Sequence, residues 1–244
     1  ISDGPFRNGS MYLTYTNEGM PIGAFWGYKT DGLIQTQEQL NAVKRADFQP
    51  NAELGDVLFV DTNGDGKLDS SDRCMIGNPI PDIIYGINMG MAWKGFDLNL
   101  QFGGTIGNQI FNAMRYYTYF PNDITNKDRA LMNYWTPNNT NTDIPRLTAT
   151  DVNDNDRFSD MYVENGTYFR LRNAQLGYTL PASLTQRIKL QKVRFYVSGQ
   201  NLFTISSYSG MDPEVGQSSS LSRGIDYGIY PQNISFTGGI NVTF

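Results

Sequence analysis

Ile83-Ile-Tyr-Gly-Ile-Asn-Met-Gly-Met-Ala-Trp-Lys-Gly-Phe-Asp-Leu-Asn-Leu-Gln-Phe-Gly-Gly-Thr-Ile106 is the stretch that decides the fold. Every second residue from Ile83 to Trp93 is apolar, and the residues between them are mostly small or polar. After Lys94-Gly95 the alternation resumes and runs to Ile106, broken only by Gly104. Because side chains of a strand point alternately to its two faces, this pattern predicts a β-hairpin with one apolar and one polar face.

The length of this hairpin and the positions of its aromatic residues favour a membrane. Each arm has about ten residues, which is the length that a tilted strand needs to cross a bilayer. Tyr85, Trp93 and Phe96 lie toward the ends of the apolar face, where aromatic belts occur in membrane proteins. A soluble hairpin can show the same alternation, but these two features together predict a hairpin of a membrane β-barrel.

The composition excludes several classes of protein. Of the 244 residues 39% are hydrophobic, and the 25 glycines and 15 tyrosines suit strands with one apolar face. No run of eighteen apolar residues exists, which excludes a helical membrane span. A net charge of −5 without a basic cluster argues against nucleic acid as a partner. The chain has no histidine, so Ser-His-Asp and Cys-His catalysis and His-based zinc sites are excluded, and we expect no chemistry from the single Cys74.

The alternation predicts six crossing strands, at Ser10–Thr16, Ile83–Trp93, Phe96–Ile106, Tyr168–Leu180, Val193–Phe203 and Ile234–Phe244. Short connections follow the second and fourth strands, and long ones follow the first, third and fifth. Outer-membrane barrels have short periplasmic turns and long external loops, so we predict that residues 17–82 and 107–166 are extracellular loops. Within them we expect short helices at Glu38–Ala46, Gln109–Tyr119 and Lys127–Tyr134. Single-chain barrels need at least eight strands, which makes this chain part of a larger barrel.

Several motifs resemble one family of membrane proteins. They are Gly55-Asp-Val-Leu-Phe-Val-Asp-Thr-Asn-Gly-Asp-Gly66, Asp72-Arg-Cys-Met-Ile-Gly-Asn-Pro-Ile-Pro-Asp82, Tyr168-Phe-Arg-Leu-Arg-Asn-Ala-Gln-Leu-Gly-Tyr-Thr-Leu-Pro181, Gly199-Gln-Asn-Leu-Phe-Thr204, Gly210-Met-Asp-Pro-Glu214 and the final Phe244. Together, and in this order, they resemble the C-terminal region of SusC/RagA-type TonB-dependent outer-membrane transporters. The resemblance covers nearly the whole chain.

The resemblance implies an all-β fold, an antiparallel transmembrane β-barrel of 22 strands with an N-terminal plug. Residues 1–244 would be the C-terminal part of that barrel domain, without the plug and the first barrel strands, and Phe244 would be the true C-terminus. The start at Ile1, without a signal segment, also leads us to expect a mature or truncated piece.

The resemblance also implies a function and partners. It implies TonB-dependent import of a glycan or peptide across the outer membrane of a Gram-negative cell, together with a SusD-type surface lipoprotein, the TonB complex and membrane lipid. The alternative from a different class is a soluble calcium-binding β-sandwich that acts as a surface adhesin or glycan-binding module. Dependence on detergent separates the two. We expect no enzymatic activity, because the chain has no histidine and no convincing nucleophile motif.

The loop from Asp61 to Asp72 has the spacing of a calcium-binding loop. Its first six residues match the EF-hand pattern D-x-[DN]-x-[DN]-G. Asp72 replaces the usual bidentate Glu at the twelfth position, and it is one methylene shorter. A Gly/Asp turn without an ion remains the alternative, but we predict a structural Ca²⁺ held by Asp61, Asn63, Asp65, the Lys67 carbonyl, Asp69 and Asp72.

Two other groups of residues suggest chemistry less strongly. The acid pairs Asp154/Asp156 and Asp212/Glu214 could be glycosidase carboxylates, but we favour ordinary capping and turn roles in a solvated loop. Trp26, Tyr28 and the aromatic run from Tyr116 to Phe120 could stack on sugar rings. Packing within the loops or against a lipoprotein explains these rings equally well.

Overall fold

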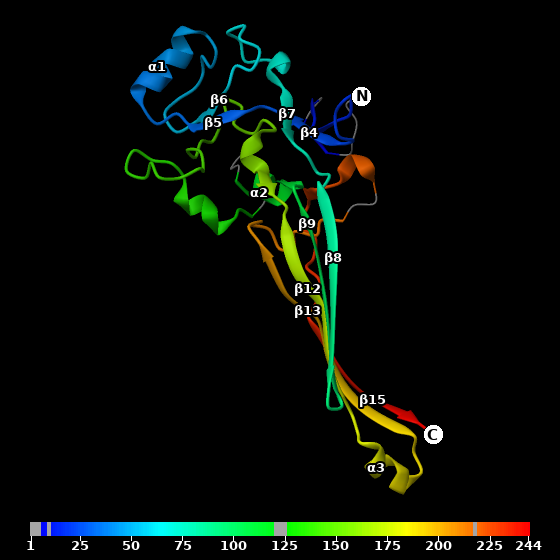
Figure 1. Ribbon diagram of the computed structural model, residues 1–244. Coiled ribbons are helices and arrows are strands. Elements are labelled where there is room, and N and C mark those ends of the chain that lie inside the picture. The colour runs from blue at the N-terminus through cyan, green and yellow to red at the C-terminus, as the bar shows by residue number, and fades with distance from the viewer. Residues whose placement is uncertain (1–5, 9–10, 120–125, 217–218) are drawn as a thin grey trace. The chain divides into compact units, whose positions relative to one another are not determined.

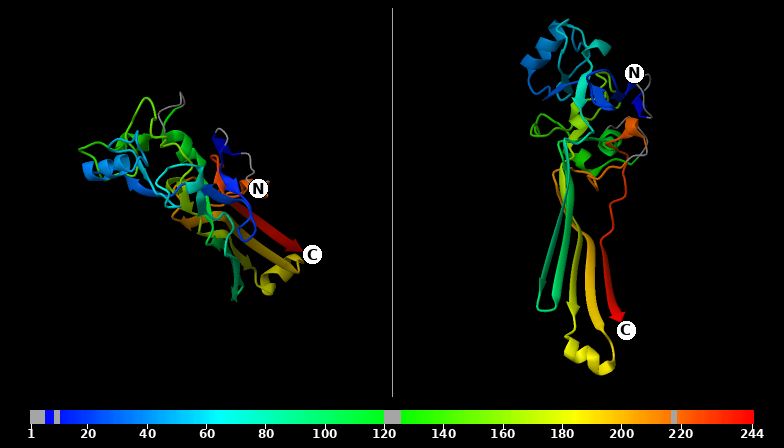
Figure 2. Two further views of the ribbon diagram at one scale, coloured as in Figure 1. Left: turned by 90° about the horizontal axis from the view of Figure 1, so that it is seen from above. Right: turned by 45° about the vertical axis from the view of Figure 1, so that its right-hand side comes forward.

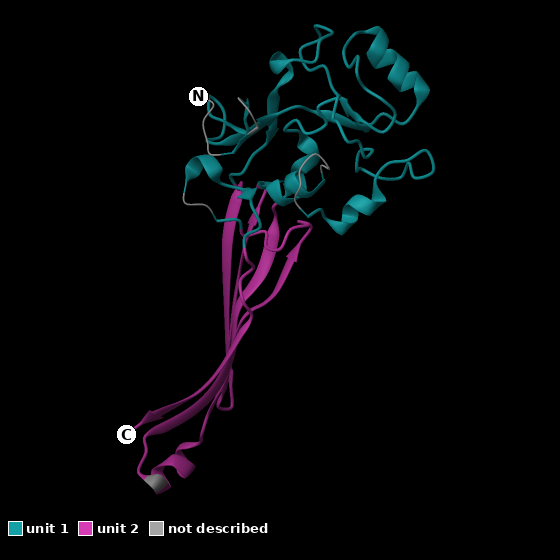
Figure 3. Cartoon of the chain, turned by 180° about the vertical axis from the view of Figure 1, so that it is seen from behind, with its two compact units in different colours: residues 1–80, 109–165, 215–229 teal, residues 81–108, 166–214, 230–244 magenta. Residues whose placement is uncertain are grey.

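The computed structural model describes residues 6–8, 11–119, 126–216 and 219–244 (Figure 1). The chain divides into two compact units, each assembled from separate segments of sequence (Figure 3). Unit 1 comprises residues 1–80, 109–165 and 215–229, and unit 2 comprises residues 81–108, 166–214 and 230–244.

Unit 2 is built on one antiparallel sheet of five long strands (Figure 2). In spatial order the strands are β15 (Ser235–Thr243), β13 (Lys192–Ser206), β12 (Tyr168–Thr179), β9 (Phe96–Ile106) and β8 (Ile83–Trp93). The predicted hairpin and the three strands that follow it are therefore confirmed. A short connection containing α3 (Ala182–Thr185) and η4 (Gln186–Ile188) joins β12 to β13.

The first of the six predicted crossing strands, Ser10–Thr16, is not formed by its described residues. Ser10 lies outside the described residues, and the rest forms the two-residue strands β2 (Met11–Tyr12) and β3 (Thr14–Tyr15), which pair with short strands of unit 1. Two residues of strand span only about 7 Å, far less than a bilayer. Leu13, between them, is fully buried in the core of unit 1, so its apolar side chain serves a packed interior. Among the described residues the crossing strands number five.

The strand register brings like residues together across the sheet. Apolar or small residues of the five strands form one row, Met89, Leu100, Ala174, Gly199 and Phe236, and the next row on the same face is Met91, Leu98, Leu176, Val197 and Gly238. The opposite face carries neutral polar residues in the row Asn88, Gln101, Asn173, Gln200 and Ser235. The predicted division into an apolar and a polar face thus extends over the whole sheet.

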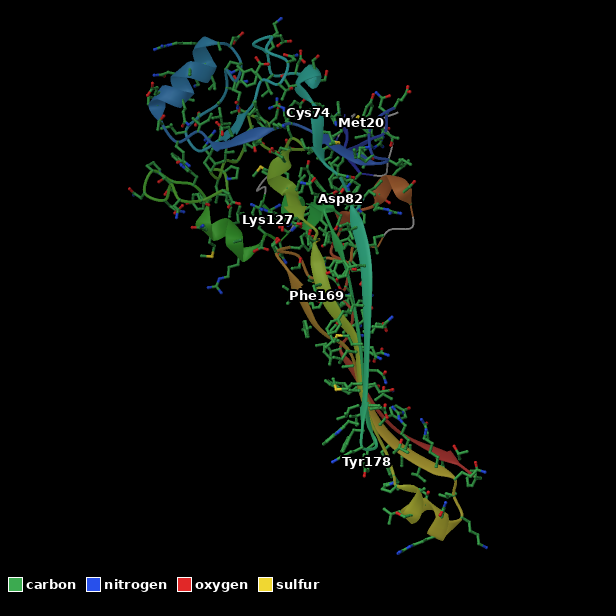
Figure 4. The ribbon with its side chains drawn as sticks, in the orientation of Figure 1. Met20, Cys74, Asp82, Lys127, Phe169 and Tyr178 are labelled. Atoms are coloured by element: carbon green, nitrogen blue, oxygen red, sulfur yellow. The ribbon has the colours of Figure 1, made fainter. Side chains whose placement is uncertain are left out.

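Aromatic side chains collect at both ends of the apolar face. At one end Phe169 stacks near Tyr85, Phe102 and Phe203, with ring centroids 5.2 to 6.5 Å apart. At the other end the rings of Phe96 and Tyr178 lie 4.5 Å apart. Phe169 and Tyr178 are both in β12 (Figure 4), and they pair with Gly104 and Phe96 of β9. These two partners are eight residues apart, which is about 26 Å at the usual strand rise of about 3.3 Å per residue. This spacing matches an apolar band of about 25 Å between two aromatic girdles.

Two backbone features follow directly from the sequence. The Lys94-Gly95 turn of the hairpin has φ values of 46° and 88°, which a two-residue type I′ turn requires and which glycine favours. Asn201, in the motif that begins at Gly199, has φ of 53° and lies where the β12–β13 register shifts. Asparagine tolerates this left-handed conformation better than most residues, so the motif encodes a β-bulge.

Unit 1 has short strands, short helices and its own apolar cores. A cluster around Phe25, Phe111, Phe158 and Tyr162 forms one core, and Tyr28, Leu33, Phe48, Val57, Phe59 and Trp135 form a second. Its remaining elements are β1 (Arg7–Asn8), β4 (Ala24–Gly27), β5 (Thr30–Leu33), α1 (Gln37–Arg45), β6 (Val57–Phe59), η1 (Ser70–Asp72), β7 (Cys74–Gly77), β10 (Gln109–Asn112), α2 (Ala113–Tyr119), η2 (Arg129–Asn133), η3 (Asp160–Tyr162), β11 (Val163–Asn165), η5 (Ser220–Ser222) and β14 (Ile225–Asp226).

The predicted helices are partly confirmed. The helix expected at Glu38–Ala46 is present as α1, and it begins with a capping box between Thr36 and Gln39. The helix expected at Gln109–Tyr119 begins only at Ala113, because Gln109–Asn112 is a strand held between β11 and β14. The segment expected at Lys127–Tyr134 forms the 3₁₀ helix η2. None of the helices in the described ranges has the length and apolar character that crossing a bilayer requires.

Leu100 and Asn99 give a direct test of the two faces. They are neighbours in the middle of β9 and point to opposite sides. Leu100→Arg should lower the free energy of unfolding in lipid by about 2–4 kcal/mol, since it places a charge at mid-membrane depth. Asn99→Arg, the matched control, should cost far less. Urea unfolding from lipid vesicles measures both, and equal losses would contradict this assignment of the faces.

Candidate functional site

The polar face of the sheet carries an ion pair near the turn end of β9. The Nε and Nη2 atoms of Arg194 donate hydrogen bonds to the two carboxylate oxygens of Asp97, over 2.9 and 2.5 Å. Gly177 of the strand between them leaves the space for this contact. A Cβ atom at Gly177 would lie 2.4 Å from Arg194 Nη2 and 2.5 Å from Asp97 Oδ1. Any larger residue at this position would force the two side chains of the ion pair out of this geometry.

A second cluster on the polar face holds the connection after β13 against β12. Arg170 is almost completely buried, and its guanidinium donates to Asp212 over 2.5 Å, to Glu214 over 2.9 Å and to Thr204 over 2.8 Å. Arg172 donates to the other oxygen of Glu214 over 2.9 Å. Asp212 also accepts the backbone N–H groups of Glu214 and Gln232. Both arginines are therefore neutralised within the cluster.

This cluster explains two of the sequence motifs together. Arg170 and Arg172 belong to the motif that begins at Tyr168, while Asp212 and Glu214 belong to the motif that begins at Gly210. Asp212 is only 4% exposed and bound to Arg170, so it is not the solvated acid that we expected, although it keeps a turn role by accepting the N–H of Glu214. This pairing was not predicted from the sequence, where its visible signal is that two arginines and two acids share the same i, i+2 spacing.

The loop of the predicted calcium site is curled around its own carboxylates. The two oxygens of Asp61 accept the N–H groups of Gly64 and Gly66, over 2.6 and 2.8 Å. Asn63 accepts the N–H of Asp65, Asp65 that of Lys67, and Asp69 that of Ser71. Hydrogen bonds from Gly66 and Gly64 hold the pKa of Asp61 below its ordinary value, so this carboxylate is charged at neutral pH.

Asp72 closes the loop from its far end. It is fully buried, and its oxygens accept the N–H groups of Thr62 and Asp69 over 3.0 and 2.9 Å. The hydrogen bond from Thr62 to Asp72 thus brings the two ends of the loop together. The other predicted ligands, Asn63, Asp65, Lys67 and Asp69, are exposed. Within the described part of the chain, no group of three or more Asp, Glu, Cys or His side chains is arranged to hold a metal ion. The calcium site stays a prediction.

The aromatic residues considered for sugar stacking differ in their burial. Tyr28 and Tyr116 are buried in the cores of unit 1 and offer no open ring face. Trp26 is half-buried and packs against Tyr15 with ring centroids 4.8 Å apart, while Tyr117 is 47% exposed. Phe120 lies outside the described residues. Most of these rings therefore pack within the unit, which was the alternative reading of the sequence.

A buried polar network in unit 1 escaped the sequence analysis. Asp56, with no exposed surface, accepts hydrogen bonds from Arg146 and Asn155. Asn155 binds the N–H of Val57, and Asn153 accepts from Gln49. In the acid pair Asp154/Asp156, Asp154 is exposed and pairs with Arg157. The backbone N–H of Asp156 donates to Asp151. The polar stretch near residue 150 is therefore largely structural.

Removing Arg170 tests whether the buried cluster is structural. Arg170→Met should lower the free energy of unfolding by about 3–5 kcal/mol, since it leaves Asp212 buried without its cation. Arg172→Met, the matched control, removes a side chain that is 37% exposed and should cost about 1 kcal/mol or less. The double variant Arg170→Met/Asp212→Leu should recover part of the loss. Equal effects of the two single variants in chemical unfolding would refute the assignment.

Comparison with known proteins gives consistent matches. The chain is 39% identical to TonB-dependent receptor P3 of Formosa agariphila over 237 residues, covering 93% of this chain and 22% of the receptor. It is 31% identical to TonB-dependent receptor P26 of the same organism, again over 93% of the chain, and 29% identical to TonB-dependent receptor SusC of Bacteroides thetaiotaomicron over 81% of it. The chain spans about a fifth of the length of these relatives. No family model matches the chain.

Solved structures give the same result for the fold. The RagAB peptide transporter superimposes with a TM-score of 0.70 at 24% identity, over 95% of this chain and 24% of that one. The RagAB peptide importer in its "closed-closed" state superimposes with a TM-score of 0.69, over 95% of this chain and 25% of the importer chain. The antiparallel strands with their two distinct faces are thus part of a transmembrane β-barrel, and the chain belongs to the SusC/RagA-type TonB-dependent receptors.

Proposed function

We propose that the protein takes part in TonB-dependent import of a nutrient, a glycan or a peptide, across the outer membrane. The observation that carries this proposal is the five-stranded sheet, which has an apolar face for lipid and a face of neutral amides and internally paired charges. Such a polar face lets hydrated, uncharged groups lie beside it. The receptors and the RagAB transporter to which the chain is similar support the same function.

The proposal includes partners and topology. A SusD-type lipoprotein would cover the external side, as the similarity to SusC and to RagAB suggests, and a TonB complex would supply energy. Residues 17–82 and 107–166, which form most of unit 1, would be extracellular loops of the C-terminal part of the barrel. We propose no catalytic role, because the acid pairs serve ion pairs and turns. The matches lend no support to a soluble β-sandwich adhesin.

Nutrient depletion tests the import function. Cells with the natural-length receptor, cells without it and cells without TonB are given a mixed panel of oligosaccharides and of peptides. We expect at least one oligomer to be depleted only when the receptor and TonB are both present, and its class identifies the substrate. Identical depletion of every oligomer by all three strains would refute import.

We also propose that the Asp61–Asp72 loop binds one structural Ca²⁺. The donors are all oxygens, which suits calcium, and Gly66 has the positive φ of 78° that the sharp turn at the sixth position needs. Asp61, Asn63, Asp65, Asp69, Asp72 and the Lys67 carbonyl would hold the ion. Its role would be to neutralise four carboxylates within twelve residues and so keep the loop closed.

Calcium removal tests this loop. Chelation should make residues 61–72 cleavable by protease, since the free carboxylates repel one another, and millimolar Ca²⁺ should restore resistance. A site of extracellular type, with Kd of about 10⁻⁴–10⁻³ M, is sufficient. Asp65→Asn/Asp69→Asn should abolish the response to calcium, whereas Asp47→Asn, an exposed acid outside the loop, should leave it unchanged. Unchanged cleavage of the wild type on chelation would exclude the site.

A further inference from the structure

The two short connections of the sheet form one continuous rim. The backbone N–H of Thr179 donates to Gly95 in the β8–β9 turn over 2.7 Å. Leu180 donates to Val193 over 2.9 Å, and Gln191 donates to Thr243 over 2.9 Å. The Lys94-Gly95 turn and the segment 181–191 are therefore fixed at the same end of the sheet. We call Lys94 and residues 181–192 the turn rim.

The turn rim carries cations without matching acids. Lys94, Arg187, Lys189 and Lys192 are all exposed, and no ion pair within 4.0 Å involves any of them among the described residues. The nearby acid Asp97 is bound by Arg194. Unit 2 as a whole has seven Lys and Arg against four Asp and Glu, although the whole chain has a net charge of −5. The positive charge of unit 2 is therefore concentrated at this rim.

Apolar and aromatic side chains lie beside these cations. Trp93 is 67% exposed, and the Lys94 Nζ atom lies 4.8 Å from the centre of its ring. Leu184 of α3 is 50% exposed, and the Phe96–Tyr178 pair lies one residue from the turn. Aromatic residues at the end of a membrane-spanning sheet mark the level of the lipid headgroups. The rim cations are therefore at the depth where lipid phosphates lie.

We propose that the turn rim binds the phosphate groups of anionic phospholipids. Lysine and arginine can lay their carbon chains along apolar surface while their charged ends reach the phosphates. A negatively charged leaflet attracts each such cation. The exposed Leu184 and Trp93 insert into the acyl region that adjoins the headgroups. An acidic soluble partner would satisfy the cations but not these apolar side chains. The inference depends on the membrane-spanning sheet and not on import.

Lipid retention by the natural-length receptor tests the proposal. The receptor is purified from vesicles of phosphatidylethanolamine and phosphatidylglycerol, and the lipids that remain bound are counted by native mass spectrometry. Wild type should be enriched in phosphatidylglycerol. Each cation near an anionic surface contributes about a fivefold gain in affinity, so Lys94→Gln/Arg187→Gln/Lys189→Gln/Lys192→Gln should lose the enrichment.

The control carries the same change of charge elsewhere. Lys29→Gln/Lys44→Gln/Arg45→Gln/Arg129→Gln removes four exposed cations of unit 1 and should keep the enrichment. If the fourfold rim variant does not fold, Arg187→Gln/Lys189→Gln replaces it, with a loss of about 25-fold in affinity expected. The proposal is wrong if wild type shows no preference for phosphatidylglycerol. It is also wrong if the rim and control variants lose the preference equally.

Discussion

Backbone hydrogen bonding is the constraint on which the rest of this structure depends. In hydrocarbon an unpaired N–H or C=O group costs several kcal/mol, so a sheet can cross a bilayer only when each strand is paired on both sides. Strands β9, β12 and β13 meet this condition within the described sheet, while β8 and β15 each have one neighbour. Their open edges of eleven and nine residues require partner strands from the rest of the receptor. The sheet is therefore stable in a bilayer only when further strands pair with both of its edges.

Once the backbone is fixed in this way, the side chains on the polar face have little freedom. Neighbouring strands lie about 4.8 Å apart, so a charged side chain that reaches across a strand needs a gap in the row. Gly177 provides that gap for Arg194 and Asp97. Gly103 does the same for Arg172, whose Nε lies 2.7 Å from the position that a Cβ atom would take. Small residues on this face thus determine which charged side chains can form ion pairs on the sheet.

The sequence predicted the features that repeat and missed those that depend on distant partners. The hairpin at Ile83–Ile106 was predictable because period-two alternation over eleven residues per arm is both long and specific. The same alternation over Ser10–Thr16 was too short to distinguish a crossing strand from Leu13 in a core. Pairing of Arg170 with Asp212 joins residues 42 positions apart, and the turn rim joins Lys94 to Arg187, so neither forms a cluster in the linear chain. Only the strand register brings such residues together.

The two units differ in what stabilises them. Unit 1 buries Phe25, Phe111 and Tyr162 in cores of its own, at about 25 cal/mol for each Å² of apolar surface removed from water. The apolar clusters of the described residues all lie in unit 1, while Phe236 of unit 2 is 79% exposed and Val197 60%. Lipid must cover these side chains, so the bilayer provides for unit 2 the apolar surroundings that the cores provide in unit 1. A substitution in unit 1 therefore acts through packing in any solvent, whereas one on the apolar face of unit 2 acts through the cost of placing that side chain in lipid.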